Sequence, residues 1–151
     1  MKILLTILTL LSIQPLKSQE IEYDGIYRYG TTADSGRTSI IYVNQNSDST
    51  LLFYLELNRG APSYNSGAIV GQMTIIGPGE ADFTMKNEGH NINCSMNFWF
   101  TNDSLYIRTN DQEDDCGYGY GVYSSGDFKK SGKEDLSFSL TGVVKNQGLT
   151  K

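Results

Sequence analysis

The chain has 151 residues, 38% of them hydrophobic and 11% aromatic, and a formal net charge of −5. Its excess of acidic residues argues against nucleic acid and anionic lipid as partners and suits a basic protein partner. A single histidine and two cysteines exclude His-rich metal sites and most metalloenzymes. The sequence therefore predicts no cofactor.

Residues 1–18 have the layout of a secretory signal peptide. Met1 and Lys2 form a positive start, residues 3–11 are almost unbroken apolar sequence, and residues 12–18 are small and polar. No later stretch approaches the roughly 18 apolar residues of a transmembrane helix, so we expect no membrane span. Cleavage after Ser18 removes two of 12 basic residues and leaves 10 against 17 acidic ones, a net charge of −7. The sequence predicts a secreted or periplasmic protein.

The remaining composition favours β-structure, because the chain has 16 Gly, 10 Tyr and 6 Phe but few good helix formers. Strand patterns separated by turn residues recur in chain order at residues 20–29, 38–43, 51–57, 68–76, 81–85, 92–100, 105–108, 116–122, 126–128 and 136–144. Residues 44–49 are expected to form a polar connector, and Gly71 a bulge or a close backbone approach. The clearest strand is 92–100, where apolar and polar residues alternate.

Many short strands and no convincing helix predict an all-β fold, a small antiparallel barrel of about eight strands with a β-sandwich as the alternative. Two observations favour the barrel. The Gly-x-aromatic segments Gly25–Tyr27 and Gly126–Phe128 could lie side by side where a sheet closes, and the glycine-lined strand 116–122 would let Trp99 cross over it. Residues 19–144 are expected to form this single domain, and residues 145–151 a frayed C-terminal tail.

Cys94 and Cys116 are the two cysteines of the chain. In an exported protein an even number of cysteines indicates a disulfide, here closing a loop of 22 residues (116 − 94). Such a loop contributes on the order of 3 kcal/mol in the chain-entropy model. No Cys-x-x-Cys pair is present, so the predicted bridge is structural.

Catalytic groups are few. His90, in the loop-like sequence Gly89-His90-Asn91, is the one histidine that could act as a base, and no nucleophile motif accompanies it. The acids Asp111, Glu113, Asp114 and Asp115 are too closely spaced to divide acid and base roles, and calcium binding there stays an open alternative. The sequence predicts a protein that is not an enzyme.

Two segments combine exposed-type aromatic residues with polar loop residues, the composition found at protein interfaces. The first is the loop 59–65, and the second begins at Cys116 and carries tyrosines on alternate positions up to Tyr120, with Tyr123 beyond. The candidate partner-binding residues are Arg59, Ser63, Tyr64, Asn65, Tyr118 and Tyr120.

Four segments carry a resemblance to known proteins: Cys94–Phe100, Leu105–Ile107, Cys116–Gly119 and Gly126–Phe128. Together they resemble β-rich modules of small secreted or periplasmic bacterial proteins of unknown function, some of which are associated with lysozyme-inhibitor-type proteins. The resemblance implies a small disulfide-bearing β-barrel of the lysozyme-inhibitor type. The predicted export and the acidic charge favour an inhibitor or immunity-type protein that acts on a basic cell-wall hydrolase such as lysozyme. It assigns no inhibitory residue in this chain.

Two other hypotheses remain open. A small barrel could enclose an apolar ligand, because an eight-stranded barrel has room for one small molecule. The protein could equally be a secreted structural or interaction protein. The strand 92–100 directs large side chains to one face, which fills a barrel rather than hollowing it, so surface binding is preferred.

Overall fold

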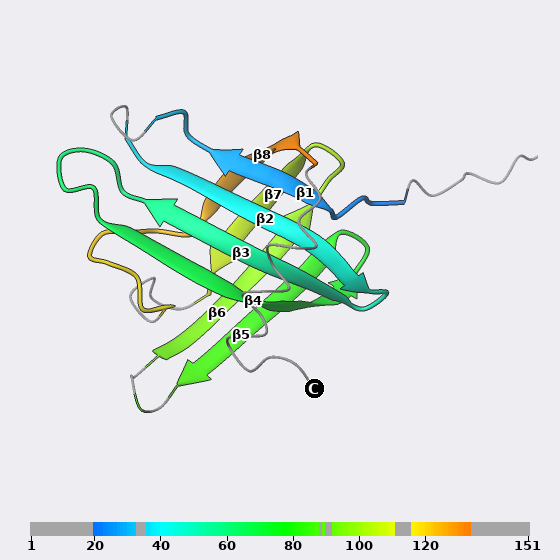
Figure 1. Cartoon of the computed structure of the whole chain (residues 1–151). Coiled ribbons are helices and arrows are strands. Elements are labelled where there is room, and N and C mark those ends of the chain that lie inside the picture. Colours follow the sequence, from blue (N-terminus) through cyan, green and yellow to red (C-terminus); the bar gives the residue numbers. More distant parts are fainter. Residues whose placement is uncertain (1–19, 33–35, 88, 90–91, 111–115, 134–151) are drawn as a thin grey trace, which may run out of the picture.

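A computed structural model describes residues 20–32, 36–87, 89, 92–110 and 116–133. Eight antiparallel strands, each hydrogen-bonded to the next in sequence, close into a barrel (Figure 1). They are β1 (Gly25–Tyr29), β2 (Thr38–Ser47), β3 (Thr50–Asn58), β4 (Ser66–Gly77), β5 (Glu80–Asn87), β6 (Ile92–Phe100), β7 (Ser104–Thr109) and β8 (Gly126–Gly132). The predicted barrel is confirmed, and the sandwich alternative is wrong.

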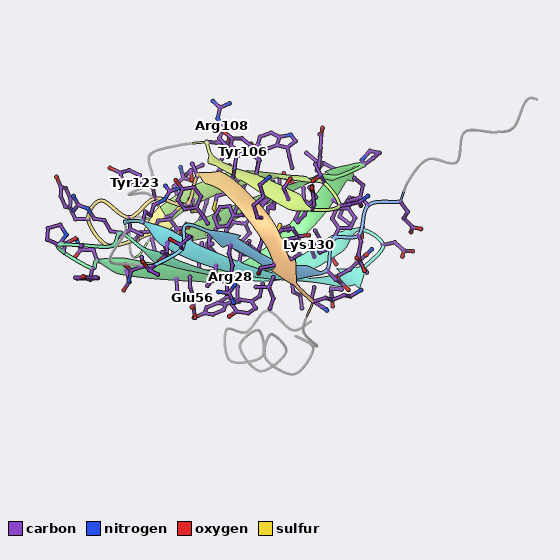
Figure 2. All side chains as sticks on the ribbon, turned by 90° about the horizontal axis from the view of Figure 1, so that it is seen from above. Arg28, Glu56, Tyr106, Arg108, Tyr123 and Lys130 are labelled. Carbon is purple, nitrogen blue, oxygen red and sulfur yellow. A yellow bond between two sulfur atoms is a disulfide. The ribbon has the colours of Figure 1, made fainter. Side chains whose placement is uncertain are left out.

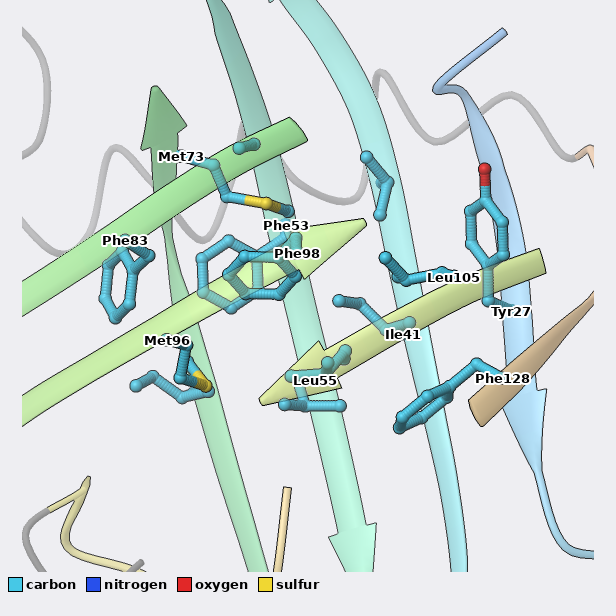
Figure 3. Close-up of a cluster of buried hydrophobic side chains, with 14 of the residues drawn as sticks. Tyr27, Ile41, Phe53, Leu55, Met73, Phe83, Met96, Phe98, Leu105 and Phe128 are labelled. Atoms are coloured by element: carbon cyan, nitrogen blue, oxygen red, sulfur yellow. The ribbon is translucent and has the colours of Figure 1, made fainter. Parts of the chain in front are cut away.

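The barrel is filled by inward-facing side chains from every strand (Figure 3). On β6 the predicted alternation holds, with Cys94, Met96 and Phe98 buried between outward polar neighbours. Phe53 lies at the centre and contacts the rings of Phe83 and Phe98 at centroid distances of 5.0 and 5.5 Å. These interlocking aromatic rings pack in the barrel interior.

Gly71 on β4 makes room for one of these rings. The pairing of β3 with β4 runs without a register shift through this residue, so it is no bulge. A Cβ atom there would lie 2.3 Å from the edge of the Phe83 ring. The close backbone approach expected from the sequence is therefore the correct one of the two interpretations.

β1 and β8 close the barrel. Tyr27 pairs with Lys130 and Arg28 with Lys129, so the two Gly-x-aromatic segments do lie in neighbouring strands. Because the strands are antiparallel, the glycines occupy opposite ends of this seam, and each leaves space for a side chain. A Cβ on Gly25 would lie 2.6 Å from the Lys130 Cε atom, and one on Gly126 would lie 2.7 Å from the Arg37 guanidinium.

Two predicted connectors differ in the structure. The expected connector 44–49 is mostly strand, because β2 continues to Ser47 and only residues 48–49 turn the chain. The polar outward side chains there need no loop, since the outer face of a barrel strand is solvated. The strand predicted at 136–144 and the tail 145–151 lie outside the described residues.

The glycine-rich strand predicted at 116–122 is wrong. Residues 116–125 form turns and irregular backbone, and Gly117 and Gly121 adopt left-handed φ values of 76° and 70° that interrupt any extended run. Nor does Trp99 cross this segment, because its ring packs on Tyr106 of the neighbouring strand. Alternating glycines thus mark turns here rather than a flat strand face.

Among the described residues no helix is long and apolar enough to cross a membrane.

Candidate binding surface at the loop end

The connections between strands differ in length at the two ends of the barrel. The connections β1–β2, β3–β4, β5–β6 and β7–β8 share one end, here called the loop end, and the short turns 48–49, 78–79 and 101–103 share the other, here called the turn end. Figure 1 shows the gold segment 116–125 beside the β3–β4 loop at the loop end. Both sequence segments chosen as candidate binding regions therefore lie at the same end of the barrel.

The β3–β4 loop, residues 59–65, is held by its own backbone. The Arg59 N–H donates to the Asn65 carbonyl at 2.8 Å, and the Tyr64 N–H donates to the Gly60 carbonyl at 2.8 Å. The side chain of Asn58 accepts a 2.7 Å hydrogen bond from the Gly60 N–H. The loop also contains a cis peptide bond between Ala61 and Pro62. These contacts fix the direction in which Arg59 and Tyr64 leave the barrel.

The disulfide holds the start of the second segment to the barrel. Cys116 is bonded to Cys94 of β6 with a Cα–Cα distance of 4.4 Å, which confirms the predicted pairing. Both cysteines are buried. Because Cys94 is an inward residue of β6, the bridge ties residues 116–125 to the barrel core.

Three further residues hold this segment down. Tyr118 is half-buried, and its hydroxyl lies 3.8 Å from the Met96 sulfur. Val122 is buried in the core cluster. Ser124 is fully buried, and its hydroxyl lies 2.6 Å from that of Thr109 at the end of β7. The side chains of Tyr120 and Tyr123, which lie between these buried residues in the sequence, are exposed to solvent.

Direct contacts join the two segments. The Asn65 side-chain amide donates a 2.8 Å hydrogen bond to the Tyr120 carbonyl. The Arg59 guanidinium carbon lies 5.7 Å from the centroid of the Tyr120 ring, within cation–π range. A Cβ on Gly121 would lie 2.8 Å from an Arg59 guanidinium nitrogen, so glycine leaves the space that this arginine occupies. The two segments thus form one continuous surface.

The side chains that face solvent on this surface are large. Tyr64, Tyr120 and Tyr123 are 48%, 81% and 50% exposed. With Arg59, which is also exposed, they are called here the tyrosine surface. Figure 2 shows Tyr123 at this end of the molecule.

The remaining candidates have other positions. Ser63 is exposed on the same loop, and Asn65 is half-buried, with its amide bonded to the Tyr120 carbonyl. Tyr118 points into the barrel, where its ring packs on Gly67 of β4. Tyr118 and Tyr120, alike in the sequence, are therefore separated by the structure into an anchor and a surface residue.

Sequence reasoning missed Arg37, which also lies at the loop end. Its guanidinium stacks 4.0 Å from the Tyr29 ring centroid and donates a 2.8 Å hydrogen bond to the Ser125 carbonyl. Arg37 therefore supports the last part of the segment that carries Tyr123. No local sequence pattern could predict this contact, because it joins residues 88 positions apart in the sequence.

The candidate catalytic and calcium-binding groups, His90 and the acids Asp111, Glu113, Asp114 and Asp115, lie outside the described residues. Within the described ranges, no three His, Cys, Asp or Glu side chains gather as a possible metal site. A depression of about 550 Å³ lies on the outer side of β1–β4, with Arg28, Tyr54 and Glu56 among its lining residues. This depression differs in position from the ligand site considered from the sequence, which would lie inside the barrel.

Comparison of the chain with protein-family models, with curated proteins and with solved structures finds no match.

Proposed function

We propose that this protein is an exported, non-enzymatic binding protein that engages a protein partner with the tyrosine surface. The observation that carries this proposal is the joining of two sequence-distant segments into one surface with three exposed tyrosines and one arginine. Tyrosine and arginine are enriched among the residues that dominate binding energy at protein interfaces.

The anchoring of the surface adds to its suitability for binding. The disulfide, the buried Ser124 and the hydrogen bond from Asn65 hold the backbone that carries the tyrosines. A surface whose backbone is fixed before binding loses little conformational entropy when the partner arrives. Anchored tyrosines therefore favour a specific interface over a chance exposure of aromatic rings.

The proposed partner is a basic cell-wall hydrolase such as lysozyme, and the proposed role is that of an inhibitor or immunity-type protein. The net charge of −7 expected after removal of residues 1–18 would attract a basic protein and speed its association. The buried disulfide is compatible with the oxidising compartment in which such enzymes act. The resemblance to lysozyme-inhibitor-type proteins supports the same choice.

The test is a calorimetric titration of the oxidised protein, lacking residues 1–18, with a basic lysozyme, with muramidase activity followed in parallel. Tyr120→Ala and Arg59→Ala remove side chains from the surface, and each is expected to weaken binding about tenfold or more. Ile76→Ala is the matched control, because Ile76 is 58% exposed near the turn end. Raising the salt concentration should slow association of the wild-type protein.

Saturable binding with loss of activity, weakened by the two surface variants but not by the control, is the expected result. Equal binding by all four proteins would contradict the role of the tyrosine surface. Absence of both heat and inhibition would contradict the choice of lysozyme as the partner.

A further inference from the structure

A second aromatic group lies on the outside of the barrel, on β6 and β7. Trp99 and Tyr106 pair directly across these strands, and their rings lie 5.5 Å apart with an interplanar angle of 34°. Trp99 is 36% and Tyr106 41% exposed, so both rings present area to solvent. This outer aromatic pair contributes nothing to the barrel interior.

Polar side chains continue the row of this pair on both sides. The strand register places Glu80 of β5 opposite Trp99 and Asp127 of β8 opposite Tyr106, which gives a row that crosses four strands. Residues that are directly paired across strands share one face of a sheet. The aromatic pair is thus flanked by an exposed carboxylate at each end.

The adjacent row is polar throughout. Asp82, Asn97 and Arg108 follow one another across β5, β6 and β7. Figure 2 shows Arg108 beside Tyr106, both pointing away from the barrel. Carboxylate, amide and guanidinium groups therefore surround the aromatic rings on this face of the sheet. All of these groups can form hydrogen bonds with hydroxyl groups.

The charged and aromatic side chains of this face limit the chemical class of ligand that it can bind. An apolar protein surface would leave the carboxylates of Glu80 and Asp127 without hydrogen-bond partners. A strongly cationic ligand would meet Arg108 and also Lys129, which pairs with Ser104 in the row on the other side of the aromatic pair. A strongly anionic ligand would meet the carboxylates of Glu80, Asp82 and Asp127. A neutral ligand with a flat apolar side and a rim of hydroxyls fits both the rings and the groups around them.

We propose that the outer aromatic pair, with its flanking polar groups, is a binding site for a neutral pyranose chain. The C–H face of a sugar ring stacks on the electron-rich faces of Trp99 and Tyr106. The surrounding side chains hydrogen-bond to the hydroxyls, which fixes the orientation of the chain. The pair adjoins the turn 101–103 at the turn end, so the site is separate from the tyrosine surface and independent of the function proposed for it.

The chain has one tryptophan, so its fluorescence reports on this site directly. The experiment titrates the oxidised protein with β-1,4-linked hexasaccharides of glucose and of N-acetylglucosamine, and with hexalysine as the cationic competitor. A saturable change in Trp99 emission with a hexasaccharide is expected, and the better of the two sugars distinguishes a plain glucan from an N-acetylated cell-wall type of glycan.

Variants test whether the change in Trp99 fluorescence depends on the outer aromatic pair. Tyr106→Ala is expected to weaken binding about tenfold, whereas Tyr106→Phe keeps the ring and should bind like the wild type. Tyr123→Ala, at the loop end, is the control and should also bind like the wild type. A saturable response to hexalysine alone, or no response to either hexasaccharide at millimolar concentration, would overturn the proposal, as would equal affinity of Tyr106→Ala and wild type.

Discussion

The two ends of the barrel differ in what their hydrogen bonds hold in place. At the turn end they hold short turns: the Thr101 hydroxyl bonds to the side chains of Asp103 and Ser104, and the Gly79 N–H donates to the hydroxyl of Tyr23, which precedes β1. At the loop end, hydrogen bonds also join long connecting segments to one another and to the barrel, as from Asn65 to Tyr120 and from Arg37 to Ser125. The bonds of the turn end fix short turns, whereas these bonds of the loop end build a surface from long segments.

This difference has an energetic consequence. A turn of two or three residues leaves little chain to order and forms together with its hairpin. A long segment costs conformational entropy to order, and here that cost is offset by a disulfide and by buried residues such as Val122. Anchoring of this kind frees the intervening tyrosines to face solvent, which is the arrangement that a binding surface requires.

Removal of the disulfide should have the largest effect and should act on the loop end. The double variant Cys94→Ala/Cys116→Ala loses the constraint on a 22-residue loop, and we expect its free energy of unfolding to fall by about 3 kcal/mol. Urea unfolding of oxidised wild type, reduced wild type and the variant measures this. If the variant matched the oxidised wild type, the anchoring of residues 116–125 would have to come from elsewhere.

Glycine substitutions compare the two ends directly. Gly79 at the turn end has φ 75°, and a Cβ there would lie 2.7 Å from the backbone oxygen of Phe100. Gly121 at the loop end has φ 70°, but the atoms that a Cβ would meet belong to the flexible Arg59 side chain. We expect Gly79→Ala to cost about 2–3 kcal/mol, from the left-handed conformation and the backbone clash together.

Gly121→Ala should cost about 1 kcal/mol, because Arg59 can move away. Its larger effect should be on partner binding, since displaced Arg59 no longer stacks beside Tyr120. Thermal unfolding and the lysozyme titration, run on both variants, measure the two effects. Equal stability losses, or loss of binding in Gly79→Ala alone, would contradict this division between the ends.

A smaller effect is expected from one buried hydroxyl. Ser124→Ala removes the 2.6 Å contact with the Thr109 hydroxyl in a site without solvent access, and we expect a loss of about 1 kcal/mol. Thr101→Ala at the turn end is the matched comparison, and because Thr101 is exposed, water can replace its bonds. Urea unfolding should rank Ser124→Ala as the more damaging, and the reverse order would argue that the segment 116–125 is not held by this contact.

The sequence predicted the barrel well because barrel strands are governed by local alternation. The inward residues of β6, the pairing of Cys94 with Cys116 and the space left by Gly71 all follow from patterns within a few residues or from the cysteine count. The end of β2 was harder to predict, since Asn44–Ser47 is polar on both faces and a polar strand end looks like a loop.

The binding surface was only partly predictable. Composition selected both of its segments, but it could not separate the anchor Tyr118 from the exposed Tyr120, because both follow a glycine in the same repeat. Which tyrosine is buried depends on Gly67 of β4, which lies far away in the sequence and receives the Tyr118 ring. The outer pair of Trp99 and Tyr106 was hidden for a related reason, since their contact depends on strand register.

The smallest expected effect is a pH dependence at the turn end, where β8 ends beside the chain that leads into β1. Glu22 accepts a hydrogen bond from Lys133 and lies 3.5 Å from the Lys130 amine, and these contacts hold the pKa of the Glu22 carboxyl below its ordinary value of 4.5. A carboxyl whose pKa is lower in the folded state stabilises that state above its unfolded pKa, and the contribution disappears as pH falls through the folded pKa.

Melting temperatures of the wild type should therefore fall with pH below about 4.5 more steeply than those of Glu22→Gln. Because Glu22 and Lys133 are both solvent-exposed, this difference should be small. It should shrink further in 0.5 M salt, where the Debye length is about 4 Å, compared with about 10 Å at 0.1 M. Glu20→Gln controls for the loss of one nearby carboxylate. Parallel pH profiles for wild type and Glu22→Gln would mean that the ion pairs at this seam add nothing to stability, and the closure of the barrel would then rest on the β1–β8 backbone hydrogen bonds and the core beneath them.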